Sequence, residues 1–393
     1  MISEKLKPLM ANNSAIRTMF EEGDRMRAEL GAENVYDFSL GNPNVPVPSE
    51  AKQALRDLIE EDSPDLHGYM SNAGFPDVRE TVARHINKEH GTSFSAKNIL
   101  MTVGAAGGMN VALKTILNAG EEVIIFAPYF LEYNWYVDNF DGKVVQAATD
   151  RKNFQPDLAD LEKKIGEKTR VVLINSPNNP TGAVYSEETI RGISEILDRK
   201  QKELGRTIFI LADEPYRELA YDGIKVPYIT RYYDNTIVSY SFSKSLSVPG
   251  ERIGYLVIPD ELEDSELVID AAGNANRIMG FVNAPSLQQK MIARCIDAKA
   301  DIGYYDRNRQ TLYKCLKECG FECIRPEGAF YLFVKSPVAD ENGFCKAAKK
   351  YNIIMVPGSA FAGPGYVRLA YCVSYETILA SEKGFRKLAA EYR

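Results

Sequence analysis

Histidine and cysteine are both scarce in this chain of 393 residues. The three histidines are His67, His85 and His90. This scarcity disfavours histidine-based catalysis and multi-histidine metal sites. The six cysteines all follow position 290, and none has the C-x2-C spacing of a zinc knuckle. We therefore expect free thiols, no metal, and chemistry that depends on other side chains.

Long apolar runs and excess positive charge are also missing. No apolar run reaches the roughly 18 residues that a membrane span needs, and the first residues lack the apolar core of a secretory signal. Lys+Arg total 47 against Asp+Glu 54, a net charge of −7, which is atypical of nucleic-acid binders and of polybasic membrane binders. We expect a cytoplasmic protein whose partners include neither nucleic acid nor membrane.

Seven short apolar runs, rich in β-branched residues, occupy the middle of the chain. They are Asn98–Val103, Glu122–Ala127, Lys143–Ala147, Arg170–Asn175, Thr207–Ala212, Thr236–Phe242 and Ile253–Ile258. Helical patterns separate several of them, and this alternation is typical of an α/β domain with a largely parallel sheet. We predict a large domain over residues 45–285.

The two ends of the chain have a different pattern. Asn13–Leu30 predicts an amphipathic helix that Gly31 ends. Leu287–Cys319 predicts one long helix, followed by short strands and a terminal helix. Together these segments predict a smaller α+β domain, discontinuous in sequence, from residues 1–44 and 286–393.

Distinctive residues follow several of the apolar runs, at the strand ends where α/β sheets bind ligands. The turn Gly104–Gly108 leads into a helix, which suits a phosphate or simply close packing. Ser176–Gly182 (S-P-N-N-P-T-G) is either a rigid turn or a device for holding one amide at a fixed angle.

Two charged residues at strand ends need partners. Asp213 would be costly to bury without a cationic ring nitrogen, a metal or a salt bridge beside it. Lys244 follows a strand and is flanked by hydroxyl groups, and burial favours the neutral amine that Schiff-base chemistry requires. Ser241 and Lys244 also match S-x-x-K, but the K-T-G and S-D-N motifs of serine acyl-enzymes are absent.

Three motifs in this order resemble the fold-type I pyridoxal-phosphate (PLP) enzymes, in the class I/II aminotransferase family close to aspartate aminotransferases. They are S-P-N-N-P-T-G at 176–182, D-E-P-Y at 213–216 and S-F-S-K-S-x-S-x-P-G-E-R-I-G-Y at 241–255. The resemblance extends from Gly41 to Arg368. It implies the PLP-dependent transferase fold, with a mostly parallel seven-stranded sheet, and pyridoxal 5'-phosphate as cofactor.

The resemblance also implies roles for individual residues. Lys244 would form a Schiff base with the cofactor and shuttle the substrate proton, and Asp213 would keep the pyridine nitrogen protonated. Asn179 and Tyr216 would bind the ring oxygen, and Tyr129 would stack on the ring. The neighbouring aromatic residues, Tyr133 among them, are interpreted as core or pocket wall. The phosphate would be held by Gly104, Ala105, Ala106, Ser241, Ser243 and Arg252, and by Tyr69 of a second subunit, which implies a homodimer with shared active sites.

Substrate recognition is implied at three further positions. Arg368 would grip the α-carboxylate, with Asn179 beside it, and the Gly41 backbone would close over the same group. Arg277 is a candidate for a side-chain carboxylate, although its spacing to Asn283-Ala284-Pro285 differs by one residue from that of dicarboxylate-specific relatives.

The implied activity is ping-pong transfer of an amino group from an L-amino acid, with aspartate preferred, to a 2-oxo acid such as 2-oxoglutarate. A PLP-dependent β-eliminating lyase of the same fold is the alternative. A non-catalytic, aminotransferase-like regulatory domain is a remote one.

Overall fold

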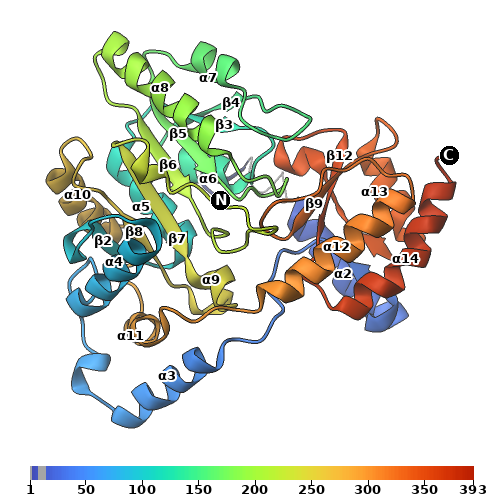
Figure 1. The fold of residues 1–393 in the computed structure, drawn as a ribbon, viewed down its shortest axis with the longest axis horizontal. Coiled ribbons are helices and arrows are strands. Elements are labelled where there is room, and N and C mark those ends of the chain that lie inside the picture. Colours follow the sequence, from blue (N-terminus) through green and yellow to red (C-terminus); the bar gives the residue numbers. More distant parts are fainter. Residues whose placement is uncertain (1, 8–14) are drawn as a thin grey trace.

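The computed structural model describes residues 2–7 and 15–393. These residues form two lobes that lie side by side (Figure 1). The larger lobe contains a seven-stranded sheet, and the smaller contains a three-stranded sheet. The first predicted helix is observed as α2 (Ala15–Leu30); residues 13 and 14 of that prediction lie outside the described residues.

The large sheet confirms the predicted α/β fold class. Its strand order is β2-β8-β7-β6-β5-β3-β4, and only β8 runs antiparallel to its neighbours. All seven strands overlap the predicted runs. They are β2 (Ile99–Thr102), β3 (Glu122–Phe126), β4 (Lys143–Ala147), β5 (Thr169–Asn175), β6 (Phe209–Asp213), β7 (Thr236–Ser241) and β8 (Gly254–Val257).

Helices cover both faces of this sheet. Successive strand residues point to opposite faces, and in β3 the residues that follow Glu122 are apolar and buried on both faces. Val123 and Ile125 of β3 pack in one hydrophobic core, and Ile124 packs in the other. Within the described parts of the chain, every helix is too short or too polar to cross a lipid bilayer. The helices of this lobe are α3 (Ser49–Glu61), α4 (Pro76–His90), α5 (Gly104–Ile116), α6 (Glu132–Asp138), α7 (Leu158–Lys164), α8 (Glu187–Leu204), α9 (Phe242–Ser245), α10 (Ser265–Ile278) and α11 (Ser286–Cys295).

The small lobe combines the two ends of the chain. Parallel pairing of β1 (Tyr36–Asp37) with β10 (Ile353–Ile354) joins the N-terminal segment to the C-terminal one. The domain limits 1–44, 45–285 and 286–393 stay a prediction. The other elements of this lobe are α12 (Ile302–Glu318), β9 (Tyr331–Lys335), α13 (Glu341–Lys349), β11 (Val356–Pro357), β12 (Tyr366–Ala370) and α14 (Tyr375–Ala390).

The prediction of one long helix over Leu287–Cys319 is wrong. The structure has two helices there, α11 and α12. The Ala298 N–H donates to the Cys295 carbonyl after α11, and the Asp301 side chain caps α12 by accepting from the Tyr304 N–H. Since α11 packs on α3 and α12 on α14, the break lies where the chain passes from one lobe to the other.

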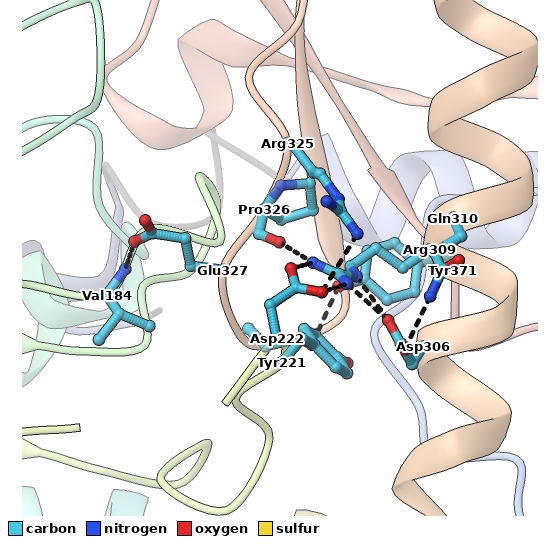
Figure 2. Close-up of polar contacts among 11 residues, drawn as sticks. Val184, Tyr221, Asp222, Asp306, Arg309, Gln310, Arg325, Pro326, Glu327 and Tyr371 are labelled. Atoms are coloured by element: carbon cyan, nitrogen blue, oxygen red, sulfur yellow. Dashed lines mark hydrogen bonds and ion pairs between the residues drawn. The ribbon is translucent and has the colours of Figure 1, made fainter. Parts of the chain in front are cut away.

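A buried arginine joins the lobes (Figure 2). Arg309 of α12 donates from Nη1 and Nη2 to the two carboxylate oxygens of Asp222, each at 2.9 Å, and from Nε to Asp306 at 2.8 Å. Its guanidinium lies 4.5 Å from the ring centroid of Tyr221. Nη1 also donates to the Pro326 carbonyl at 2.7 Å. These contacts fix the segment that leads into β9.

Candidate active site

Three parallel strands bring the predicted motifs to one edge of the large sheet. β5, β6 and β7 are direct neighbours, and Asn175, Asp213 and Ser239 lie level with one another in the pairing. The 176–182 loop, Asp213 and Lys244 therefore open from the same edge, where ligands of such sheets bind.

Lys244 lies on the short helix α9, immediately after β7. Its Nζ donates to the Gly41 carbonyl at 2.9 Å and lies 5.2 Å from the ring centroid of Phe330. Burial lowers the pKa of Lys244 to about 8, helped by the positive charges of Arg252 and Arg368 and opposed by Cys372. The amine therefore becomes neutral far more readily than that of an ordinary lysine.

Asp213 ends β6 with one carboxylate oxygen engaged and one free. Oδ2 accepts from the Tyr133 hydroxyl at 2.6 Å, whereas Oδ1 is buried without a partner among the described residues. Burial raises the pKa of Asp213 to about 7, the Tyr133 hydrogen bond lowers it, and the charge of Glu214 raises it. The free oxygen can accept from a ligand, and a cation there would stabilise the carboxylate.

Gly104 and Arg252 form a cradle at the start of α5. Gly104 has φ +67°, and a Cβ there would lie 2.5 Å from Arg252 Nη2, so both conformation and space favour glycine. No side chain caps α5, which leaves N–H groups of its first turn for an anion. Ser241 and Ser243 complete the cradle: their hydroxyls are 2.7 Å apart, and Arg252 Nη1 donates to Ser243 at 3.5 Å. The first-turn amides include those of Ala105 and Ala106.

Arg368 reaches this edge from β12 of the small lobe and is 2% exposed. Nη1 donates to Asn179 Oδ1 at 3.0 Å and Nη2 to the Ser39 carbonyl at 2.6 Å. Nε is buried and has no described partner. Burial lowers the pKa of Arg368, but a guanidinium remains charged in proteins. The Arg368 guanidinium is therefore a fixed positive charge whose Nε–H is free to donate, which suits a carboxylate ligand.

Tyr331 of β9 was not among the predicted site residues. Its hydroxyl lies 3.0 Å from that of Tyr216, and its ring centroid lies 4.5 Å from the Arg368 guanidinium. A Cβ at Gly41 would be 2.0 Å from the Tyr331 hydroxyl, so glycine is needed for this approach. Local sequence offered no signal for Tyr331, because an aromatic residue in a buried strand is typical of any core.

Cys372 is a second residue that the sequence did not point to. It is buried, and its Sγ lies 3.6 Å from the Leu40 carbonyl. Burial raises the pKa of the Cys372 thiol to about 12, although the charges of Lys244 and Arg368 lower it. The thiol therefore stays protonated beside the lysine.

The aromatic stretch in and before α6 lines the site near Asp213. Tyr129 is buried, and its hydroxyl donates to Asn134 at 2.9 Å and accepts from Gln146 at 3.1 Å. Its ring stacks with Tyr133 at 6.5 Å between centroids. Tyr129 is thus adjacent to the residue that contacts Asp213.

Tyr69 and Arg277 are not brought to the site within this chain. The Tyr69 side chain is 93% exposed, and Arg277 is exposed on α10. Figure 1 shows α10 at the opposite end of the molecule from β12, which carries Arg368. Asn72 donates to the Val282 carbonyl at 2.7 Å, so the segment after Tyr69 packs beside the one that follows Arg277.

Comparisons with known proteins agree with this architecture. Residues 32–379 match the family model described as aminotransferase class I and II, and the chain belongs to this family. An aspartate aminotransferase of Pyrococcus horikoshii is 31% identical over 96% of this chain and 95% of the relative. An aromatic-amino-acid aminotransferase 2 of Thermococcus litoralis is 30% identical over 99% and 98%.

Solved structures are similar over their full length. An aminotransferase from Eubacterium rectale has a TM-score of 0.97 and 46% identity, covering 100% of this chain and 99% of that one. The aspartate aminotransferase of Thermus thermophilus with maleate has a TM-score of 0.87 and 25% identity, covering 99% of each. The protein is therefore a PLP-dependent aminotransferase.

The residues present fit this cofactor. The orphaned Oδ1 of Asp213 matches the need of a protonated ring nitrogen, and the cradle of Gly104 and Arg252 matches a phosphate. No group of three or more metal-ligating side chains lies together in the described part of the chain.

Proposed function

We propose that this aminotransferase takes the amino group of an L-amino acid, preferentially aspartate, and passes it to a 2-oxo acid such as 2-oxoglutarate in two half-reactions. The observation that carries this proposal is the meeting of Lys244 and Arg368 from opposite lobes. Gly41 binds Lys244 through its carbonyl, and Ser39, two residues earlier, binds Arg368. One short backbone segment thus connects an amine that deprotonates readily to a carboxylate-binding cation.

The site residues divide into those for the cofactor and those for the substrate. Pyridoxal 5'-phosphate, when bound, supplies the electron sink that weakens the Cα–H bond of the amino acid. Asp213 would hold its ring nitrogen, and Tyr129 would stack on the ring. Asn179 and Tyr216 would bind the ring oxygen. The phosphate would be held by Gly104, Ala105, Ala106, Ser241, Ser243 and Arg252.

Lys244 is the proposed acid–base residue. As a neutral amine it takes the proton from the substrate Cα, and as an ammonium it returns a proton. Its lowered pKa, about 8, places the two states within reach of each other near neutral pH. Arg368 fixes the α-carboxylate with its unpartnered Nε, so that the Cα hydrogen is presented to Lys244.

The donor preference has support from relatives of different specificity. Among the similar proteins are aspartate aminotransferases and an aromatic-amino-acid aminotransferase. The first group favours aspartate as the donor. Arg277 would then bind the side-chain carboxylate in the active site of a second subunit, since it is exposed in its own.

We further propose a homodimer with shared active sites, working in the cytoplasm. Support for the dimer comes from apolar side chains exposed on α10, where Leu267 is 68% and Ile278 62% exposed, and from the exposure of Tyr69. The six cysteines are all free, as is usual in a reducing compartment.

A spectral half-reaction tests the proposed function. The PLP-loaded protein is mixed with aspartate, alanine, phenylalanine or other amino acids without an oxo acid, and conversion to the pyridoxamine-type spectrum is recorded. We expect aspartate to react fastest and 2-oxoglutarate to restore the starting spectrum. Release of pyruvate and ammonia from a β-substituted amino acid, without any acceptor, would favour the lyase instead.

The variant Arg277→Ala should slow the half-reaction with aspartate far more than the half-reaction with alanine. Equal losses of rate for both amino acids would show that Arg277 does not bind the substrate side chain.

A further inference from the structure

Among the described residues, the Tyr133 hydroxyl is the one hydrogen-bond partner of the Asp213 carboxylate. It donates to Oδ2 at 2.6 Å, and the Tyr133 side chain is 2% exposed. Burial raises the pKa of Tyr133 well above its usual value, and the negative charge of Asp213 raises it further. Tyr133 therefore keeps its proton at every working pH and remains a donor to Asp213.

The ring of Tyr133 packs against three other aromatic rings. Phe130 packs edge-on at 5.7 Å between centroids, Tyr136 edge-on at 6.3 Å, and Tyr129 stacks at 6.5 Å. A donor fixed by packing costs little side-chain entropy when its hydrogen bond forms. The packed ring of Tyr133 on α6 therefore holds its hydroxyl against Asp213 at the end of β6.

Other groups that face Asp213 do not stabilise its charge. Tyr136 of α6 faces it, as do Glu214 and Tyr216 from its own segment. Among the described residues, none of the lysines, arginines or histidines forms an ion pair with Asp213. Burial and Glu214 both favour the protonated acid, and the Tyr133 hydrogen bond opposes them. Arg217 compensates Glu214 rather than Asp213.

We propose that Tyr133 is a positioning residue: its hydroxyl keeps the Asp213 carboxylate ionised and turned so that Oδ1 stays free for the ring nitrogen of the cofactor. This inference rests on the proposed function of Asp213. It assigns a role to a residue that lies outside the three sequence motifs of the family resemblance.

The inference predicts a pH-dependent loss of cofactor affinity. Asp213 must be ionised to hold a protonated ring nitrogen, so binding weakens as pH falls through its pKa. Without the Tyr133 hydroxyl that pKa rises, so in Tyr133→Phe the acid limb, the pH range in which binding weakens on acidification, moves up by about one pH unit. The dissociation constant then rises roughly fivefold at pH 7 and approaches a roughly tenfold rise at lower pH. At pH 9 the carboxylate is ionised in both proteins and the difference shrinks.

Cofactor titration of the apo-protein provides the readout. Trp135, the single tryptophan of the chain, lies two residues from Tyr133 and reports pyridoxal phosphate binding by fluorescence quenching between pH 5.5 and 9. Tyr233→Phe is the matched control, because this buried tyrosine donates to the carbonyl of Ile208, just before β6, whereas Asp213 lies at the other end of that strand. It should leave the acid limb unchanged.

A double variant separates a positioning role from a purely structural one. In Asp213→Asn the side chain has no charge to preserve, so adding Tyr133→Phe should weaken cofactor binding little further. An unmoved acid limb in Tyr133→Phe, the same shift in Tyr233→Phe, or an undiminished loss in the Asp213→Asn background would each overturn the inference. If the wild-type protein loses cofactor affinity at low pH as expected but does not transaminate, the proposed function is contradicted and this inference stands.

Discussion

At the scale of single residues, Lys244 shows how burial produces reactivity. Its amine lies among Gly41, Phe330 and the charges of Arg252 and Arg368. A low-dielectric environment disfavours the ammonium, and two nearby cations disfavour it further. Cys372 would oppose them only as a thiolate, and burial raises the pKa of its thiol to about 12, so the thiol is uncharged near neutral pH.

This environment predicts the pH dependence of cofactor attachment. Only the neutral amine attacks a carbonyl, and the pKa of Lys244 is about 8. The rate of Schiff-base formation with pyridoxal phosphate should therefore rise by about tenfold per pH unit below 8 and level off above it. Stopped-flow absorbance measures this rate, with Lys244→Ala as the blank. An inflection near 10, the value of an ordinary lysine, would contradict the prediction.

At the scale of elements, a buried arginine side chain connects helix α12 to the large lobe. Arg309 is fully buried and pairs with Asp222, whose side chain is 40% exposed. If Arg309 were truncated, Asp222 could regain water, but the Pro326 carbonyl and the ring of Tyr221 would lose their partner.

Replacement of Arg309 by methionine keeps much of the apolar stem and removes the charge. We expect Arg309→Met to lower the free energy of unfolding by about 3 kcal/mol, as breaking one side of a buried ion pair does. Urea denaturation followed by circular dichroism measures it. Arg191→Ala, which removes an exposed pair with Glu187 on α8, is the control and should leave the midpoint unchanged. Equal midpoints for all three proteins would show that Arg309 does not stabilise the junction.

The elements also show what the sequence could predict. The seven strands were found because each is a short apolar run, a property local to the chain. The break between α11 and α12 was missed, because apolar residues continue across it and its local signal is a single capping residue, Asp301. Strand order was likewise invisible, since it depends on contacts between distant segments.

The same division applies to the candidate site. Lys244, Asp213 and Asn179 stood out because charged or amide side chains after buried strands are unusual. Tyr133 and Tyr331 did not, because a buried tyrosine that serves a carboxylate or a guanidinium has the same sequence environment as one that fills a core.

At the scale of the whole molecule, two residues predicted to serve an active site lie away from the site of this chain. Tyr69 and Arg277 were predicted to serve an active site, yet both lie on the outer surface of their own subunit. Hydrogen bonds from Asn72 to Val282 and from Asn276 to Asn72 join their two segments into one surface. A second copy related by two-fold symmetry would place each surface against the partner's equivalent.

The proposed sharing of active sites predicts that two inactive variants rescue each other. Lys244→Ala removes the amine of its own site, whereas Tyr69→Ala would damage the site of its partner. In a hybrid dimer, one site carries both defects and the other carries neither. Random exchange of equal amounts puts half of the chains into hybrids, so activity should recover to about a quarter of the wild-type value. The measurement is transaminase activity after unfolding and refolding the mixture, compared with the variants refolded separately. Activity equal to the mean of the two separate variants would mean that each chain builds its site alone, with Tyr69 serving no partner.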